Sequence, residues 1–206
     1  VYSMYEKVSK SVSDTIKNNF FPVIISGDHS IAGATIAGIK IAKPQSKLGV
    51  IWIDAHADMH TPYTTPSGNV HGMPLAITLG EDNKNCAVHD LDDETKSYWE
   101  KLKNIGKISP KVLAEDLVMI STRDYEKEEK YVIDKHNIKL ISTKEVRTKG
   151  PESIVRSVIR HLDDCTDIYV SFDVVALDSS ISRGTGTPVG NGLREREVED
   201  LISKFM

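Results

Sequence analysis

Short apolar runs alternate with longer amphipathic segments along the chain. The apolar runs have the length and the aliphatic residues of buried strands, whereas the amphipathic segments repeat their apolar residues every three or four positions, as helices do. The predicted strands are residues 22–26, 48–54, 117–121, 138–142 and 167–175. The predicted helices are residues 3–19, 30–42, 74–79, 94–104, 125–136 and 151–163, with a last one that begins near residue 194.

Strands that alternate with helices indicate βαβ units, in which helices cover both faces of a parallel sheet. No internal repeat, low-complexity tract or break in composition marks a second domain, so we expect a single α/β domain over residues 1–206. The chain opens at Val1 and stops at Met206 inside helical patterns, and we therefore expect this domain to be partial at both ends.

Composition narrows the class of protein. The 206 residues include 26 basic and 30 acidic side chains, and the mean hydropathy of −0.28 is typical of a globular protein in water. No apolar run approaches the roughly 20 residues that cross a bilayer. The net charge of −4 argues against nucleic acid as the main partner, and two distant cysteines exclude a disulfide scaffold. We expect a cytoplasmic enzyme or binding protein with no membrane and no nucleic-acid partner.

Residues with metal-binding side chains follow three of the predicted strands. In parallel α/β sheets, ligands bind in the loops after the carboxyl ends of the strands. His29 follows the first strand, where it is a candidate ligand or a structural histidine, and the preceding Asp28 is a candidate helix N-cap. Asp173 lies in the last strand, as a candidate ligand or a loop cap.

A denser group of such residues, Asp54-Ala55-His56-Ala57-Asp58, begins at the end of the second strand. In extended backbone every second side chain points to the same face, so Asp54, His56 and Asp58 would converge. Buried carboxylates so close together need a cation or strong hydrogen-bond donors, which favours a metal site over a solvated loop. Together the three strand ends offer imidazoles and carboxylates, a donor set that suits Mn²⁺, Zn²⁺ or Fe²⁺.

These residues carry a resemblance to the ureohydrolases, the family of arginase, agmatinase and formiminoglutamase. That family shares the motifs GGDHS, DAHxD and SxDxDxxDP, followed by GTGTP and a glycine-rich turn. The corresponding segments here are SGDHS at 26–30, DAHAD at 54–58, SFDVVALDSS at 171–180 and GTGTPVGNG at 184–192. They occur in the family's order and span most of the chain.

The resemblance implies a three-layer α/β/α domain with a central parallel sheet and two Mn²⁺ ions at the strand ends. One manganese would be held by His29, Asp54, Asp58 and Asp173. The other would be held by His56, with Asp54 and Asp173 bridging the two ions. Asp58 would also orient a metal-activated hydroxide that attacks the guanidinium carbon of a small substrate.

Residues 61–72 are similar to the arginase loop with its TP…TTxSGNxHG pattern. The resemblance implies that Ser67 and Asn69 contact the amino-acid end of the substrate and that His71 shuttles protons at the leaving amine. Glu126, which follows an Arg-Asp pair, would receive the substrate ammonium, although a solvated helix face is an alternative role. The implied reaction is the hydrolysis of L-arginine to L-ornithine and urea, in a homotrimer or homohexamer.

Four departures from the family pattern bear on this interpretation. Ser26 replaces the first glycine of GGDHS, and His60 stands where arginases carry an Asn that touches the substrate, which makes it a candidate substrate-binding residue. The chain ends before the C-terminal Glu with which many members grip the guanidinium. Val175 occupies the second Asp of SxDxD, a ligand of the second metal, and in extended backbone it would point into the metal pocket together with Asp173.

Two alternatives to an arginase therefore stay open at this point. The first is an agmatinase-type or formiminoglutamase-type specificity. The second is a member of the family that has lost catalysis and serves as a binding or regulatory protein, which Val175 and the absent C-terminal Glu favour.

Overall fold

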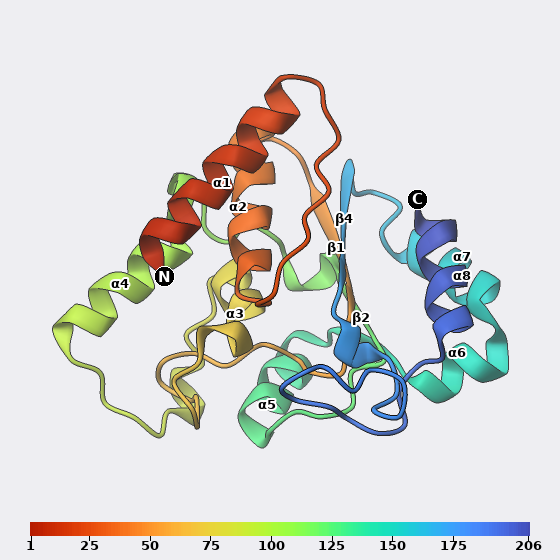
Figure 1. The fold of residues 1–206 in the computed structure, drawn as a ribbon. Helices are drawn as coiled ribbons and strands as arrows, with labels where there is room; N and C mark the ends of the chain where they lie inside the picture. Colours follow the sequence, from red (N-terminus) through yellow and green to blue (C-terminus); the bar gives the residue numbers. More distant parts are fainter. The chain divides into compact units, whose positions relative to one another are not determined.

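The computed structural model describes residues 1–206, which form two compact units (Figure 1). Unit 1 comprises Val1–Ser46, Asp58–Leu113 and Lys127–Lys135, and unit 2 comprises Lys47–Ala57, Ala114–Glu126 and His136–Met206. None of the helices combines the length and the apolar character needed to span a bilayer.

Unit 1 is helical. The predicted helices at its start are confirmed, and the small residues of the second helix have a clear role. A Cβ atom added at Gly38 would lie only 2.6 Å from the carbonyl oxygen of Ser9, so glycine is what allows the first two helices to pack this closely. The elements of this unit are α1 (Tyr2–Lys17), α2 (Ile31–Ala42), α3 (Pro74–Leu79), α4 (Asp93–Lys103) and α5 (Lys127–His136), with short 3₁₀ turns η1 (Val70–Gly72), η2 (Lys84–Cys86) and η3 (Ile105–Lys107).

Unit 2 contains the sheet. Its four strands pair in parallel in the order β3-β2-β1-β4, which confirms the predicted parallel sheet. The strands are β1 (Leu48–Ile53), β2 (Leu117–Ile120), β3 (Lys139–Ile141) and β4 (Asp167–Phe172). The other elements are α6 (Thr143–Lys149), α7 (Pro151–His161) and α8 (Glu195–Phe205), with 3₁₀ turns η4 (Ala114–Asp116) and η5 (Val174–Ala176).

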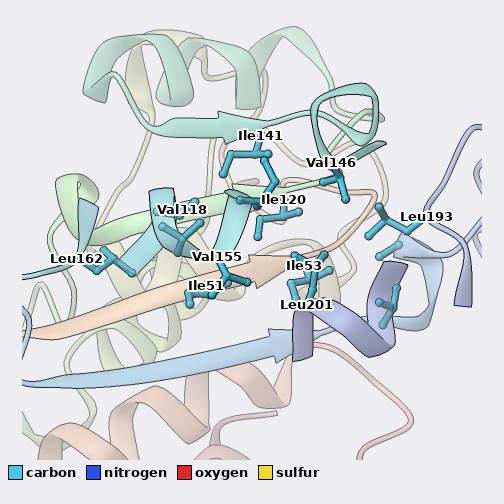
Figure 2. Packing of buried hydrophobic residues seen from close by; sticks show 14 residues of the cluster. Ile51, Ile53, Val118, Ile120, Ile141, Val146, Val155, Leu162, Leu193 and Leu201 are labelled. Atoms are coloured by element: carbon cyan, nitrogen blue, oxygen red, sulfur yellow. The ribbon is translucent and has the colours of Figure 1, made fainter. Parts of the chain in front are cut away.

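Helices α6, α7 and α8 flank this sheet through a shared apolar core (Figure 2). Alternate residues of a strand point to one face, and Ile51 and Ile53 of β1 accordingly belong to the same buried cluster as Val155 of α7 and Leu201 of α8. The register pairs Ile53 with both Ile120 and Phe172. The carboxyl ends of β1, β2 and β4 therefore lie level at one edge of the sheet.

The structure corrects three of the predicted elements. Residues 22–26 form no strand, and Ile25 is 97% exposed, because an apolar run becomes a strand only where a neighbouring strand satisfies its backbone. The last strand ends at Phe172 instead of residue 175, since the chain turns into η5. Helix α6 was not predicted: most of its residues are polar, and its signal is a capping box between Ser142 and Glu145.

Candidate active site

Two aspartates follow paired residues on neighbouring strands of unit 2. Asp54 comes after Ile53 of β1, and Asp173 comes after Phe172 of β4. The backbone N–H of Asp173 donates to the carbonyl of Ile53 at 3.0 Å, so the strand pairing continues up to the site. Carboxylate oxygens of Asp54 and Asp173 lie within 4.8 Å of each other, and Asp54 is only 1% exposed. Ionised carboxylates at this separation repel each other, and a divalent cation between them removes that repulsion.

Each of these carboxylates is oriented by a backbone N–H two residues further along the chain. Oδ1 of Asp54 accepts from the N–H of His56 at 3.0 Å, and Oδ1 of Asp173 accepts from the N–H of Val175 at 2.9 Å. Such turns end the extended backbone. The prediction for Val175 assumed that the backbone stays extended from Asp173 to Val175, and this assumption is wrong because Val175 lies in η5. Val175 is nevertheless buried, with 3% exposure.

The same correction applies to the DAHAD motif. Its backbone does not stay extended, because Asp58 adopts a left-handed conformation with φ of 50°. The motif divides between the units, with Asp54 and His56 in unit 2 and Asp58 in unit 1. The directions of these three side chains therefore depend on local turns and not on the alternation of a strand.

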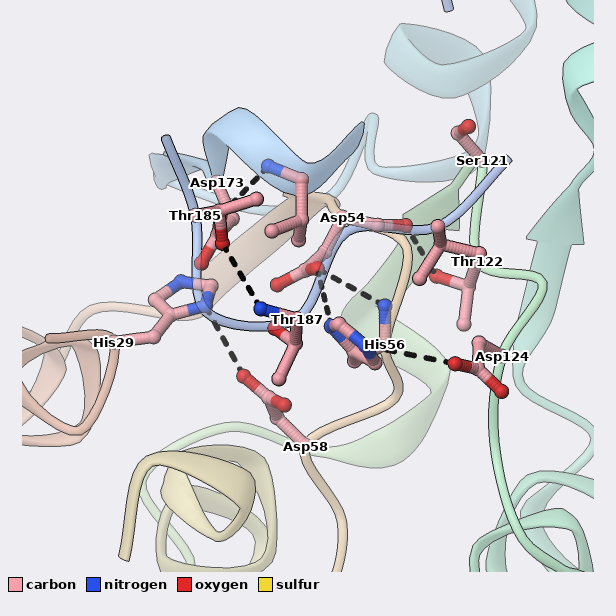
Figure 3. A network of polar contacts seen from close by, with 12 residues as sticks. His29, Asp54, His56, Asp58, Ser121, Thr122, Asp124, Asp173, Thr185 and Thr187 are labelled. Atoms are coloured by element: carbon pink, nitrogen blue, oxygen red, sulfur yellow. Dashed lines mark hydrogen bonds and ion pairs between the residues drawn. The ribbon is translucent and has the colours of Figure 1, made fainter. Parts of the chain in front are cut away.

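His56 lies between two carboxylates of unit 2 (Figure 3). Its Nδ1 is 3.6 Å from Oδ1 of Asp54, and its Nε2 is 3.8 Å from Oδ2 of Asp124. These separations exceed hydrogen-bond length, so the contacts are ion pairs when the imidazole is protonated. The backbone N–H groups of Arg123 and Asp124 both donate to the carbonyl of Ala55, at 2.8 and 3.0 Å, which fixes the segment that carries Asp124.

A second histidine–carboxylate pair lies in unit 1. Nδ1 of His29 is 3.1 Å from Oδ2 of Asp58, and both side chains are largely buried (Figure 3). Asp28 accepts the N–H of Ser30 at 2.9 Å, while Ser30 itself occupies the N-cap position of α2. Burial raises the pKa of Asp28, but the hydrogen bonds from Ser30 and the positive charges of His71 and His29 outweigh it, and the pKa is lowered. His71 therefore lies close enough to this turn to act on it electrostatically.

The loop predicted to bind substrate is exposed at its tip. Ser67 and Asn69 are both exposed, and Oγ of Ser67 accepts the backbone N–H of Asn69 at 3.2 Å. Between them Gly68 has a φ of 75°, a conformation in which glycine is favoured. Nε2 of His89 lies 2.7 Å from the carbonyl of Thr65 and ties the loop to the chain that follows α3. The two predicted substrate contacts are thus adjacent to each other.

Two other predicted substrate residues differ in exposure. Glu126 is exposed, in the position before α5. His60 is buried, with its Nδ1 3.1 Å from Oγ1 of Thr64 and its Nε2 3.6 Å from Oε2 of Glu129. The ring of His60 thus contacts the loop's own Thr64 and a carboxylate of α5, and its contact with substrate stays a prediction.

The sequence did not indicate the role of Arg123. Its guanidinium donates to the carbonyls of Gly190, Val189 and Val175, at 2.8, 2.9 and 3.1 Å. Burial lowers the pKa of this side chain. Arg123 therefore fixes the glycine-rich loop and the turn after Asp173 through backbone atoms, which leave no pattern in the sequence.

Asp178 is a further residue whose role was missed. It closes the base of the same loop, since its Oδ1 accepts the N–H of Ser180 at 3.0 Å and its Oδ2 accepts the N–H of Gly192 at 3.1 Å. Hydrogen bonds from Ser180 and Gly192 lower the pKa of Asp178 to about 2. The Asp-Ser-Ser sequence is the signal that predicts such a turn.

Fold and site together define a parallel α/β protein with a carboxylate–imidazole site of the kind that holds divalent cations. The chain belongs to the arginase family, whose model matches residues 1–206, and this confirms the ureohydrolase resemblance. The chain is 39% identical over 193 residues to the arginase of Brevibacillus brevis, a match that covers 93% of this chain and 59% of that protein.

Solved arginases have the same fold. The structure of arginase from Bacillus caldovelox matches with a TM-score of 0.84 and 36% identity, over 98% of this chain and 62% of that one. The arginase of Entamoeba histolytica, solved in complex with L-ornithine, matches with a TM-score of 0.80 and 30% identity, over 98% and 65%. The chain thus spans about 60% of the length of these relatives.

Proposed function

We propose that this chain carries the core of a manganese-dependent amidinohydrolase that converts L-arginine to L-ornithine and urea. The observation that carries the proposal is the pair of carboxylates, Asp54 and Asp173, within 4.8 Å of each other at level strand ends. Membership of the arginase family supports the substrate class. Because the chain spans 59% of the length of Brevibacillus brevis arginase, the activity of the whole protein is part of the proposal.

The donor set fits Mn²⁺, since oxygen ligands predominate and imidazoles complete the set. The proposed ligands of one ion are His29, Asp54, Asp58 and Asp173, and those of the other are His56 and the two aspartates of unit 2. Asp58 follows Asp54 by only four residues, so the chain keeps them within about 14 Å of each other. Such ions, when bound, acidify a water molecule and polarise a guanidinium group.

The remaining residues address the substrate in this proposal. Ser67 and Asn69 offer a hydroxyl and an amide that can donate hydrogen bonds to a carboxylate, and the exposed carboxylate of Glu126 suits an ammonium group. His71 would donate a proton to the leaving amine, since imidazole exchanges protons near neutral pH. His60 would influence substrate choice, and the active assembly would be a homotrimer or homohexamer.

One observation favours a second candidate, a binding or regulatory protein without turnover. Val175 is a buried valine beside Asp173 and offers no lone pair to a metal. Under this second candidate the chain holds one cation and binds a guanidino compound without hydrolysing it. An agmatinase-type or formiminoglutamase-type hydrolase is the remaining alternative on substrate choice.

A urea-release assay separates these candidates. L-Arginine and agmatine are each offered to the protein with excess Mn²⁺ and with EDTA. We expect Mn²⁺-dependent urea from arginine at a kcat/KM well above that for agmatine, because a site built for a polar substrate group rejects the analogue that lacks it. A preference for agmatine would assign the agmatinase specificity. Binding of arginine without urea would assign the regulatory role.

A further inference from the structure

Helix α5 carries a buried carboxylate in its first turn. Glu129 is 3% exposed, and its Oε1 accepts the backbone N–H of Met59 at 3.0 Å. Its Oε2 lies 3.6 Å from Nε2 of His60. The first turn of a helix stabilises negative charge, so the position favours an ionised glutamate.

The N–H that Glu129 accepts belongs to the peptide group between Asp58 and Met59. The carbonyl of that same peptide accepts the N–H of Leu75 at 3.0 Å. Glu129 and Leu75 therefore hold the two polar atoms of a single peptide group, one from α5 and one from α3. This arrangement fixes the rotation of the peptide plane that follows Asp58.

The rotation of this plane sets ψ of Asp58, a residue whose φ of 50° already lies in the left-handed region that non-glycine residues rarely adopt. Its surroundings must impose such a conformation. In this conformation Oδ2 of Asp58 lies 3.1 Å from Nδ1 of His29. A peptide free to rotate would relax toward a common conformation and carry the Asp58 carboxylate away from His29.

We propose that Glu129 is a positioning residue for Asp58. It accepts the Met59 N–H and thereby holds the Asp58 carboxylate toward His29, in the orientation needed to bind a divalent cation. The proposal rests on the proposed function in one respect, the assignment of Asp58 and His29 as metal ligands. Loss of a group that orients a metal ligand typically weakens metal affinity roughly 10- to 100-fold.

The test compares three variants of the full chain. Glu129→Leu keeps the bulk and removes the acceptor, Glu129→Gln keeps an acceptor oxygen, and Glu128→Leu makes the same substitution at the neighbouring position. Mn²⁺ affinity is measured by titration with detection of the free ion by electron paramagnetic resonance. We expect Glu129→Leu to weaken Mn²⁺ binding about 10- to 100-fold. Glu129→Gln and Glu128→Leu should bind as the unaltered chain does.

A second measurement needs no metal. In the metal-free protein with ¹⁵N-labelled methionine, the exchange of the Met59 amide hydrogen is followed by NMR. We expect this amide to exchange at least tenfold faster in Glu129→Leu and at the original rate in Glu129→Gln, with the amide of Met119 in β2 unchanged in both. If Glu129→Leu does not fold, Glu129→Asp replaces it in both measurements. Aspartate is one methylene shorter, so its carboxylate lies further from the Met59 N–H.

The two measurements distinguish the possible failures. Met59 exchange that is unchanged in Glu129→Leu overturns the proposal, as does unchanged Mn²⁺ affinity in that variant. An unaltered chain that binds no Mn²⁺ overturns the proposed metal site instead, while the Met59 amide still tests whether Glu129 holds the peptide.

Discussion

Replacing Val175 with aspartate should destabilise the chain strongly without Mn²⁺ and much less with it. Val175 is 3% exposed, so the substitution removes about 1.5–3 kcal/mol of apolar burial. The new carboxylate is also desolvated beside Asp173, and an unpaired buried charge costs about 3–5 kcal/mol. A total of about 4.5–8 kcal/mol, at 2–4 °C per kcal/mol for a chain of this size, lowers Tm by roughly 9 °C or more in EDTA.

Manganese should reverse most of this loss. A ligand at a thousandfold excess over its Kd stabilises the native state by about 4.1 kcal/mol, and under the proposed function the aspartate adds a ligand for a second ion. The assay is a thermal melt in EDTA and in excess Mn²⁺. The control is Val174→Asp, since Val174 is 51% exposed and a carboxylate there should shift Tm little in either buffer. An equal loss of Tm for Val175→Asp in both buffers would refute the reasoning.

Three further predictions concern other residues. His71→Ala should lower kcat about 10²- to 10⁴-fold with unchanged metal content, and full turnover in that variant would remove His71 from proton transfer. Burial lowers the pKa of Lys111 from 10.5 to about 8, so the folded state binds this proton less tightly than the unfolded state does. Lys111 therefore destabilises the fold fully below pH 8 and progressively less as the pH rises to 10.5. Lys111→Met should therefore raise Tm at pH 7 by an amount that shrinks toward pH 10.5, and a difference independent of pH would contradict this. The pKa of Asp178 is lowered from 3.8 to about 2, so its contribution to stability is present above pH 4 and is lost as the pH falls toward 2. Asp178→Asn should abolish this loss of stability between pH 4 and pH 2. Acid unfolding of both proteins, monitored by circular dichroism, checks this, and identical acid-unfolding curves would contradict it.

Strands were predictable where the fold supplied a partner. Residues 48–54 and 22–26 are both apolar, yet only the first run pairs, with β2 and β4 on its two sides. Nothing in the composition of 22–26 distinguishes it from a buried strand. Pairing is a property of the whole fold, and a single sequence read locally does not contain it.

Backbone periodicity was a poor guide to the candidate site. Alternation assumed extended backbone through Asp58 and Val175, whereas turns interrupt it at both places. Asp54 and Asp173 each accept the N–H two residues ahead and so form a turn, whereas Asp58 leaves the extended conformation through its own left-handed backbone. Contacts to backbone atoms, such as those of Arg123 and Glu129, were not predictable because any sequence supplies the partner atoms.

The most direct test of the central claim is a count of manganese in the unaltered chain. The protein is loaded with Mn²⁺, desalted and examined by native mass spectrometry. One tightly held Mn²⁺ per chain is expected under the proposed function, with a second ion only at excess Mn²⁺, because residue 175 is a valine and offers no ligand to the proposed second position. A chain that retains no Mn²⁺, or one that retains two after desalting, would contradict the account.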